Sequence, residues 1–348
     1  MNFYNKILNS KYPYIIAEIG SNHNGSTNLA KKLIKKAKLG GADAVKFQSW
    51  SKNSLFSKKS FEDNYFLKDD YRNRSDTNLE DILEKYSFKE NQMIAAANFA
   101  KKNKIDFSST PFSVNEVDFL INKIRPPFIK IASMDLNNIP FIEYIAKKKL
   151  PIIISTGLSN LKEIDLAIST IEKCKNKKII IMHCVAIYPT NDIDVNLNNI
   201  ETLQKAYGYP IGFSDHSLGF EIPLASVVKG VKIIEKHFTL DRSMEGWDHK
   251  VSADLETLKI ICKGSKRIID SLGSFRIQAP ESKLIKKEFK RSAVATKNLP
   301  KGHKITNDDI NYKRPGRGIE PNDNKFLVNR LLNKDIEKDK IIYWKDLL

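Results

Sequence analysis

The chain has 348 residues, 41% of them hydrophobic, which exceeds one typical domain and supplies enough apolar side chains for a large core. Its formal net charge of +17 comes from lysines scattered in short pairs, and not from one stripe with interleaved aromatic residues, so we expect no nucleic-acid partner. No apolar run approaches the ~18 residues that cross a bilayer, no secretory pattern opens the sequence and the three cysteines lack paired spacing, so we expect a cytoplasmic protein without a membrane partner.

Two sequence patterns alternate along most of the chain, one typical of strands and one typical of helices. Short runs rich in Ile, Val and Phe predict eight strands, at 14–20, 44–50, 105–111, 128–133, 151–157, 179–185, 210–216 and 231–238. Stretches with apolar residues at three-to-four spacing predict helices between them, at 29–39, 88–102, 114–124, 139–149, 161–173, 200–206 and 221–228. This alternation predicts a (β/α)8 TIM barrel in the α/β class. An open doubly wound sheet is the alternative, but no G-x-G-x-x-G follows a strand.

The texture changes near residue 273. A charged stretch at 281–290 predicts a helix, and the segments KNLPKGHKITNDDI and KDIEKDKIIYWKDL then match each other with lysines, turn and terminal aliphatic residue in register. They predict a small β-rich module built on a pseudo-repeat, with the loop YKRPGRG exposing Arg314 between the copies. The expected domains are a barrel over 1–272, a linker with a helix over 273–290 and the small domain over 291–348.

Polar residues gather where the predicted strands end, which is where barrel enzymes carry their catalytic groups. In two neighbouring strands they occur at spacing two, and therefore on one face: Ser214 with His216, and Glu235 with His237. Two imidazoles in matching positions predict a site for a divalent metal. The alternative is that each histidine caps its strand by bonding a backbone carbonyl.

Other strand-end residues divide by chemistry. Lys46 and Lys130 predict a cationic pocket for phosphate and carboxylate, together with the hydroxyl groups of Ser133, Ser155 and Ser214. Amide and carboxylate groups that can bind a polyhydroxylated ligand are those of Asn24, Gln48 and Asp135, and the loop after the last strand adds Asp248 and His249 close to the pocket. An anion site, a metal and a sugar-like pocket predict carbon–carbon bond chemistry on a phosphorylated small molecule. For Ser108, Thr156 and His183 a structural cap is the better interpretation.

Short motifs along the chain carry a resemblance. In order they are AEIGSNHNGS, AVKFQ, SSTPF, FIKIAS, ISTG, HC with YPT, GFSDHSLG, IEKHFTLD and YKRPGRG. In this order, over nearly the whole chain, they resemble the sialic acid synthase family. The resemblance implies a (β/α)8 barrel followed by a small antifreeze-like, or SAF, domain. It also implies a transferase that condenses phosphoenolpyruvate with an N-acetylated hexose, such as N-acetylmannosamine, to give a nine-carbon 2-keto-3-deoxy acid and phosphate.

The resemblance implies roles for individual residues. His216 and His237 would bind the metal, Mn2+ in the first place, with Mg2+ or Co2+ as alternatives. Phosphoenolpyruvate would be held by Lys46, Lys130, Ser133, Ser155 and Ser214, with Thr110 nearby. The sugar side would be lined by Gln48, Tyr188 and Asp248, and in a homodimer Arg314 would come from the SAF domain that covers the partner's barrel. The catalytic candidates are Lys46, which stabilises charge, and the carboxylates Asp135 and Glu235, between which spacing does not decide.

Several positions depart from the commonest family pattern and leave the acceptor sugar open. Ala186 precedes the YPT tyrosine by two residues, Asp135 stands where Glu is common, and the GWDH segment brings Trp247 and His249. A legionaminic or pseudaminic acid synthase, acting on a diacetamido-trideoxyhexose, is therefore an alternative. Two alternatives of other classes are a Schiff-base lyase that uses Lys46 or Lys130 and a non-catalytic SAF-type binding protein.

Overall fold

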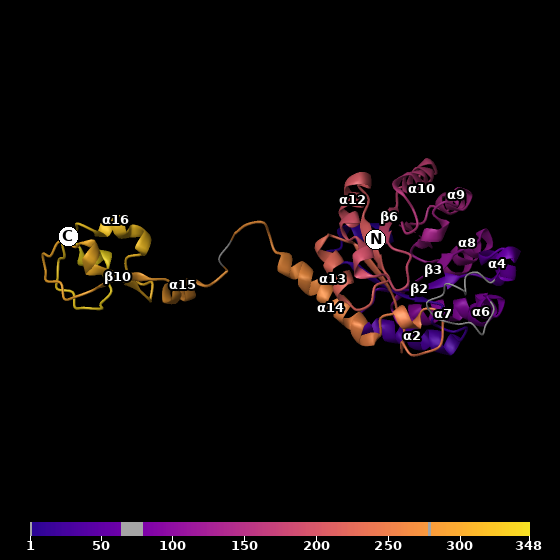
Figure 1. Cartoon of the computed structure of the whole chain (residues 1–348), viewed down its shortest axis with the longest axis horizontal. Coiled ribbons are helices and arrows are strands. Elements are labelled where there is room, and N and C mark those ends of the chain that lie inside the picture. The colour runs from indigo at the N-terminus through magenta and orange to yellow at the C-terminus, as the bar shows by residue number, and fades with distance from the viewer. Residues whose placement is uncertain (1, 64–78, 278–279) are drawn as a thin grey trace. The chain divides into compact units, whose positions relative to one another are not determined.

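The computed structural model of the chain describes residues 2–63, 79–277 and 280–348, apart from the side chains at 52 and 53. The chain divides into two compact units, Met1–Gly273 and Ser274–Leu348 (Figure 1). In the part of the chain that is described, no helix combines the length and the apolar content that a membrane span needs.

Eight parallel strands form the centre of the first unit, in the order β3-β2-β1-β8-β7-β6-β5-β4. Their bounds are β1 Tyr14–Gly20, β2 Ala44–Ser49, β3 Asp106–Pro111, β4 Ile129–Ile131, β5 Ile152–Ser155, β6 Ile179–Cys184, β7 Ile211–Asp215 and β8 Ile233–His237. Between the two ends of this order, the Ser108 hydroxyl donates to the Phe128 carbonyl at 2.7 Å and links the start of β4 to β3. The predicted barrel is confirmed.

Helices surround the strands of this unit (Figure 1). The α-helices are α1 Phe3–Asn9, α2 Thr27–Gly40, α3 Lys52–Leu55, α4 Lys58–Asp63, α6 Leu79–Tyr86, α7 Glu90–Lys102, α8 Val114–Phe119, α9 Ile139–Lys147, α10 Leu161–Lys173, α11 Asp192–Val195, α12 Asn198–Tyr207, α13 Glu221–Val228 and α14 Leu255–Leu272. Shorter turns are the π-helix η1 Leu120–Ile124 and the 3-10 helices η2 Ser133–Asp135 and η3 His249–Val251. The structure differs from the predicted helices in two ways: the stretch 114–124 ends in the π-turn, and several helices, among them α1, α6 and α14, were not predicted.

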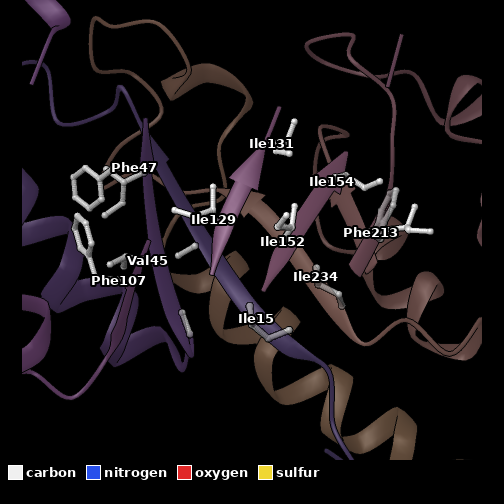
Figure 2. Close-up of a cluster of buried hydrophobic side chains, with 14 of the residues drawn as sticks. Ile15, Val45, Phe47, Phe107, Ile129, Ile131, Ile152, Ile154, Phe213 and Ile234 are labelled. Atoms are coloured by element: carbon white, nitrogen blue, oxygen red, sulfur yellow. The ribbon is translucent and has the colours of Figure 1, made fainter. Parts of the chain in front are cut away.

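Alternation along the strands sends side chains to two different cores. Outward residues such as Ile15, Val45 and Phe213 pack beneath the helices in one large cluster (Figure 2). Inward residues at the N-terminal ends of the strands, such as Ile153 and Ile180, form a second cluster that Phe3 and Ile7 of α1 complete. Because side chains alternate at period two, strands such as β1, β2, β5, β6 and β8 contribute to both cores and still have inward positions left at their C-terminal ends.

The second unit is small and has its own apolar core. It contains α15 Lys283–Phe289, β9 Ser292–Ala295, β10 Ile310–Lys313 and α16 Asn324–Leu327, with 3-10 turns η4 Asn307–Asp309, η5 Pro321–Asp323 and η6 Trp344–Asp346. β9 and β10 pair antiparallel, and isolated bridges such as Val294 with Ile341 extend this pairing. Buried Asp309 in η4 stabilises this unit, since its carboxylate contacts the Lys297 and His303 side chains at 2.8 Å each.

Candidate active site

A cavity of about 800 Å³ opens at the C-terminal ends of the barrel strands. Its lining includes most of the residues that the sequence singled out: Lys46, Gln48, Thr110, Lys130, Ser133, Ser155, Tyr188, Ser214, His216, Glu235, His237 and Asp248. Together with Glu18 and Ser21, which come from β1 and the loop after it and also line the cavity, these side chains represent all eight strands, so closure of the barrel is what brings them together.

Two lysines and two glutamates form a buried cluster at the floor of this cavity. The Lys46 ammonium lies 2.7 Å from a Glu18 carboxylate oxygen and 3.6 Å from Glu235. Lys130 donates to both oxygens of Glu235, at 3.0 and 3.2 Å. Since all four side chains are at most 6% exposed, neither lysine is solvated, and each is held by a carboxylate. In the expected cationic pocket the two positive charges are therefore balanced by two carboxylates. An anionic ligand must compete with these carboxylates for the two ammonium groups.

Glu18 is a site residue that the sequence places at the end of a predicted strand but to which no role was assigned. It lies on β1 in the run YIIAEIG, on the same face as Tyr14 and Ile16, where a charged residue inside an apolar strand was the available signal. A side chain at Gly20, whose φ is +53°, would come within 3.3 Å of the Glu18 carboxylate and 3.5 Å of Asp248. A glycine here keeps both the left-handed backbone and open space beside the carboxylate.

The two carboxyl groups of the cluster have different proton affinities. Burial and the neighbouring Glu235 raise the pKa of Glu18 to about 7, against the lowering effect of Lys46. For Glu235 burial acts in the same direction, but Lys130 and Lys46 outweigh it and hold its pKa well below the usual range. Glu235 is thus ionised at neutral pH, whereas Glu18 is poised to give or take a proton.

His216 and His237 lie side by side above this floor, with ring centroids 5.5 Å apart. Nδ1 of His216 bonds the Val185 carbonyl at 2.7 Å, which leaves Nε2 as the nitrogen with the free lone pair. Nδ1 of His237 is buried and has no hydrogen-bond partner. Burial lowers the pKa of His216 to about 4 and that of His237 to about 3, so both rings are neutral at pH 7, as a metal ligand must be.

These features fit a site in which the chain supplies only some of the ligands of a divalent ion. Among the described residues no group of three His, Cys, Asp or Glu side chains is arranged to bind a metal. A catalytic metal keeps positions open for substrate or water, and two neutral imidazoles with one orphaned nitrogen agree with such a partial shell. The alternative was that each histidine bonds a backbone carbonyl. Nδ1 of His216 does so, whereas Nδ1 of His237 does not.

A buried ion pair fixes the strand positions that carry the two histidines. Lys236 Nζ lies 2.5 Å from a carboxylate oxygen of Asp215 and from the Ser217 carbonyl. Asp215 in turn accepts from the Ser217 backbone N–H at 2.9 Å. Because Asp215 and Lys236 are register partners in β7 and β8, this clamp locks the residues immediately before His216 and His237.

The predicted sugar side contains direct lining residues and residues that only support them. The Gln48 amide donates to Glu18 at 3.3 Å, and the Asp248 carboxylate accepts from Ser21 at 3.2 Å. His249 instead bonds Thr239 at 2.6 Å and Asn24 at 3.2 Å. Asn24, predicted as a ligand contact, and His249, predicted to lie close to the pocket, thus hold the β8–α14 loop to the loop after β1.

Asp135 and Arg314, like Asn24, were predicted as site residues and are not among the residues that line the cavity. Asp135 lies in η2, with one buried oxygen that lacks a partner, and burial raises its pKa to about 6. Arg314 belongs to the second unit, where its guanidinium lies 5.4 Å from the centre of the Phe289 ring. The contact of Arg314 with a partner's barrel stays a prediction.

His183, interpreted as a cap, does bond the Val195 carbonyl, at 2.6 Å.

Comparison with known proteins agrees with this architecture. The NeuB family model matches residues 33–276, and the SAF domain model matches residues 290–348. An N,N'-diacetyllegionaminic acid synthase of Campylobacter jejuni is 37% identical over 335 residues, covering 95% of this chain and 99% of its own. An uncharacterized protein of Methanocaldococcus jannaschii is 42% identical over 336 residues, covering 96% and 94%.

Among solved structures, the N-acetylneuraminic acid synthetase of Leptospira borgpetersenii, determined with citrate, aligns with a TM-score of 0.70 at 35% identity. The alignment covers 79% of this chain and 90% of that one. The extent of the family match, together with the barrel and its polar mouth, establishes that this chain belongs to the NeuB family and carries a C-terminal SAF domain.

Proposed function

We propose that the chain is a nonulosonic acid synthase, a transferase that joins phosphoenolpyruvate to the aldehyde carbon of an open-chain N-acetylated hexose. The products are a nine-carbon 2-keto-3-deoxy acid and inorganic phosphate. The observation that carries the proposal is the pair of neutral imidazoles, His216 and His237, directly above two buried lysines that are held by Glu18 and Glu235. The relatives named as diacetyllegionaminic and pseudaminic acid synthases support the same reaction class.

The lysines and hydroxyl groups hold the donor substrate. Lys46 and Lys130 exchange part of their contact with the glutamates for the phosphate and carboxylate oxygens of phosphoenolpyruvate, and Ser133, Ser155 and Ser214 add donors. Ser155 Oγ is buried and has no partner in the structure, which leaves it ready for a ligand oxygen. Preformed donors of this kind stabilise charge on the transferred groups without reorganisation.

Bond formation joins C3 of phosphoenolpyruvate to the aldehyde carbon, water adds at C2, and phosphate leaves as its C–O bond breaks. A divalent ion bound by His216 and His237, Mn2+ in the first place, would supply Lewis-acid polarisation of the aldehyde oxygen. Glu18, with its pKa near neutral, gives a proton to that oxygen as the carbon–carbon bond forms and takes one from the attacking water. Glu235 stays ionised and orients Lys130 throughout.

Phosphate release tests the proposal. The full chain with Mn2+ is expected to release phosphate from phosphoenolpyruvate only when an N-acetylated hexose is also present, with N-acetylmannosamine and diacetamido-trideoxyhexoses as acceptors. Phosphate release without acceptor, or none with any acceptor, would contradict a synthase. Borohydride is expected to trap no adduct, whereas an adduct on Lys46 or Lys130 would favour the Schiff-base lyase.

A further inference from the structure

We infer that the barrel carries, at the N-terminal ends of its strands, a basic surface that binds an anionic lipid membrane. The inference goes beyond the proposed function and concerns the end of the barrel opposite the cavity. The surface, here called the basic face, consists of the four segments that lead into β3, β4, β5 and β6, which are residues 101–106, 121–128, 147–151 and 172–178. These segments contain twelve lysine or arginine residues and two acidic residues, a net charge of +10 out of the +17 of the chain.

The four segments are distant in sequence but adjacent in the barrel. β4 pairs with β5 and β5 with β6, and the Ser108 hydroxyl links β3 to the start of β4. The Asn176 amide donates to the Leu150 carbonyl at 2.9 Å, and the Lys178 ammonium donates to the Lys149 carbonyl at 3.3 Å. Lysines that are scattered along the sequence therefore lie together at one end of the barrel. The inference replaces the expectation, drawn from the sequence, of no membrane partner.

Most of these charges are not neutralised by neighbouring side chains. Among the residues that the structure describes, acidic side chains pair with two of the twelve cations, Lys147 and Lys148. The two acidic residues of the segments, Asp106 and Glu172, each accept a hydrogen bond from a tyrosine hydroxyl group, at 2.5 and 2.6 Å. Ten of the twelve basic side chains are exposed. The basic face thus presents positive charge to any surface that approaches this end of the barrel.

The backbone indicates that some of these cations are kept at a cost in stability. Each segment has a basic residue in the left-handed conformation just after a helix, with φ between +54° and +63°: Lys104, Arg125, Lys149 and Lys175. The helices that lead into β2, β7 and β8 have glycine there instead: Gly41, Gly208 and Gly230. Glycine adopts this conformation without strain, whereas lysine and arginine do not. The last turns of α7, α9 and α10 already contain lysines that complement the helix dipole, so the dipole does not account for the strained cations.

The composition of the basic face favours a lipid surface over other partners. Eleven of its twelve cations are lysines, which are compact charges that need no fixed partner geometry. None of the four segments exposes a large apolar side chain of the kind that anchors a protein interface. Their one aromatic residue, Phe128, is buried and cannot stack on a nucleic-acid base. Anionic headgroups attract lysines near the membrane surface without such specific contacts.

The first experiment measures flotation of the full chain with lipid vesicles. Vesicles of phosphatidylcholine with about 30% phosphatidylglycerol are expected to bind the chain, and vesicles of phosphatidylcholine alone are not, because the attraction is electrostatic. Raising the salt concentration from about 0.1 M to about 1 M shortens the Debye length from about 10 Å to about 3 Å, and is expected to weaken binding at least about 10-fold. Equal binding to both kinds of vesicle, or no binding to either, overturns the inference.

The second experiment replaces the strained cations by glycine, with the changes Lys104→Gly, Arg125→Gly, Lys149→Gly and Lys175→Gly in one variant. Its affinity for anionic vesicles is expected to fall about 100-fold. Its melting temperature is expected to equal or exceed that of the wild type, because glycine removes the strain. None of the four residues lines the cavity, so phosphate release is expected to be unchanged. A loss of binding without a loss of stability separates a binding role from a structural one.

The matched control removes four exposed lysines from the second unit, with the changes Lys301→Gln, Lys304→Gln, Lys338→Gln and Lys340→Gln. Both variants lower the net charge by the same amount, and the control is expected to bind anionic vesicles within about threefold of the wild type, because screening limits each charge to its own neighbourhood. An equal loss in both variants would show that net charge alone drives binding, which overturns the role of the basic face.

Duplex DNA provides the third comparison, since it is also a polyanion. Wild-type chain is expected to bind anionic vesicles at a salt concentration at which it no longer binds duplex DNA. If DNA is instead bound more tightly at the same salt concentration, and the glycine variant loses both activities, the basic face binds nucleic acid and the membrane assignment is wrong.

Discussion

At the N-terminal ends of the strands, here called the lower end of the barrel, the inward residues of β1, β5 and β8 are Ile16, Ile153 and Ile233. They pack against helix α1. The C-terminal ends of the strands, where the cavity opens, are the upper end. Two residues further along the same strands the inward residues are Glu18, Ser155 and Glu235. The same alternation thus produces an apolar plug at one end and a buried polar cavity at the other. Burying charges costs free energy that burying isoleucine does not, so the apolar layer at the N-terminal ends supplies stability that offsets the cost of the polar layer, which we propose serves the reaction.

Exchanging one side chain at each end gives the largest expected contrast. Lys130→Met removes a donor for the substrate anion and is expected to lower kcat/KM for phosphoenolpyruvate by about 1,000-fold. Ile180→Ala, in the lower layer, is expected to cost about 2–5 kcal/mol of unfolding free energy with kcat of the folded protein unchanged. Denaturant unfolding and phosphate release on both variants check this. Comparable losses of activity in both would erase the distinction between the two ends.

A homodimer would complete the upper end with Arg314 from the partner chain. Arg314→Ala and His216→Ala are each expected to be inactive, and an equal mixture that has exchanged subunits is expected to regain about a quarter of wild-type activity. Half of the dimers are then mixed, and one of their two sites carries neither lesion. No return of activity, with mixed dimers demonstrated by mass, would place Arg314 in its own chain's site or outside it.

The Lys236 clamp gives a smaller effect that separates positioning from stability. Lys236→Met leaves the Asp215 carboxylate buried without its partner and is expected to destabilise the chain by about 3–5 kcal/mol. The double variant Lys236→Met with Asp215→Leu is expected to recover stability but to bind Mn2+ about 10–100-fold more weakly, because the histidines lose their fixed register. Lys11→Met, which removes an exposed pair with Asp270, is the control. Wild-type Mn2+ affinity in the double variant would show that the clamp serves folding alone.

The smallest effect concerns Asp135. Burial raises the pKa of Asp135 in the folded chain to about 6, above the usual 3.8, so between these pH values the folded chain holds a proton that the unfolded chain has lost. Stability is therefore expected to fall as pH rises through this window, and Asp135→Asn is expected to remove that part of the slope. Melting temperatures of both proteins across the window measure it. Parallel curves would mean that Asp135 titrates alike in both states.

Local pattern was enough to predict the barrel and most of the cavity lining. Period-two spacing placed His216 on the same face as Ser214, and His237 on the same face as Glu235, since that relation depends only on the strand. The pairing of Glu18 with Lys46 depends instead on β1 lying beside β2, which is a property of the closed sheet. For the same reason Asn24 was predicted as a ligand contact, although a partner distant in sequence, His249, makes it a support for the loop.

The most direct test of the proposed metal site at the upper end of the barrel removes metal from the protein and then restores it. Chelator-treated wild-type chain is expected to release no phosphate with both substrates present, and to regain activity as about one Mn2+ binds per chain. His216→Ala and His237→Ala are expected to stay inactive at the same Mn2+ concentrations while unfolding at nearly the wild-type temperature. Full activity in the stripped wild-type protein, or Mn2+-dependent activity in either variant, would contradict the assignment of the two histidines and of the upper layer as the reaction centre.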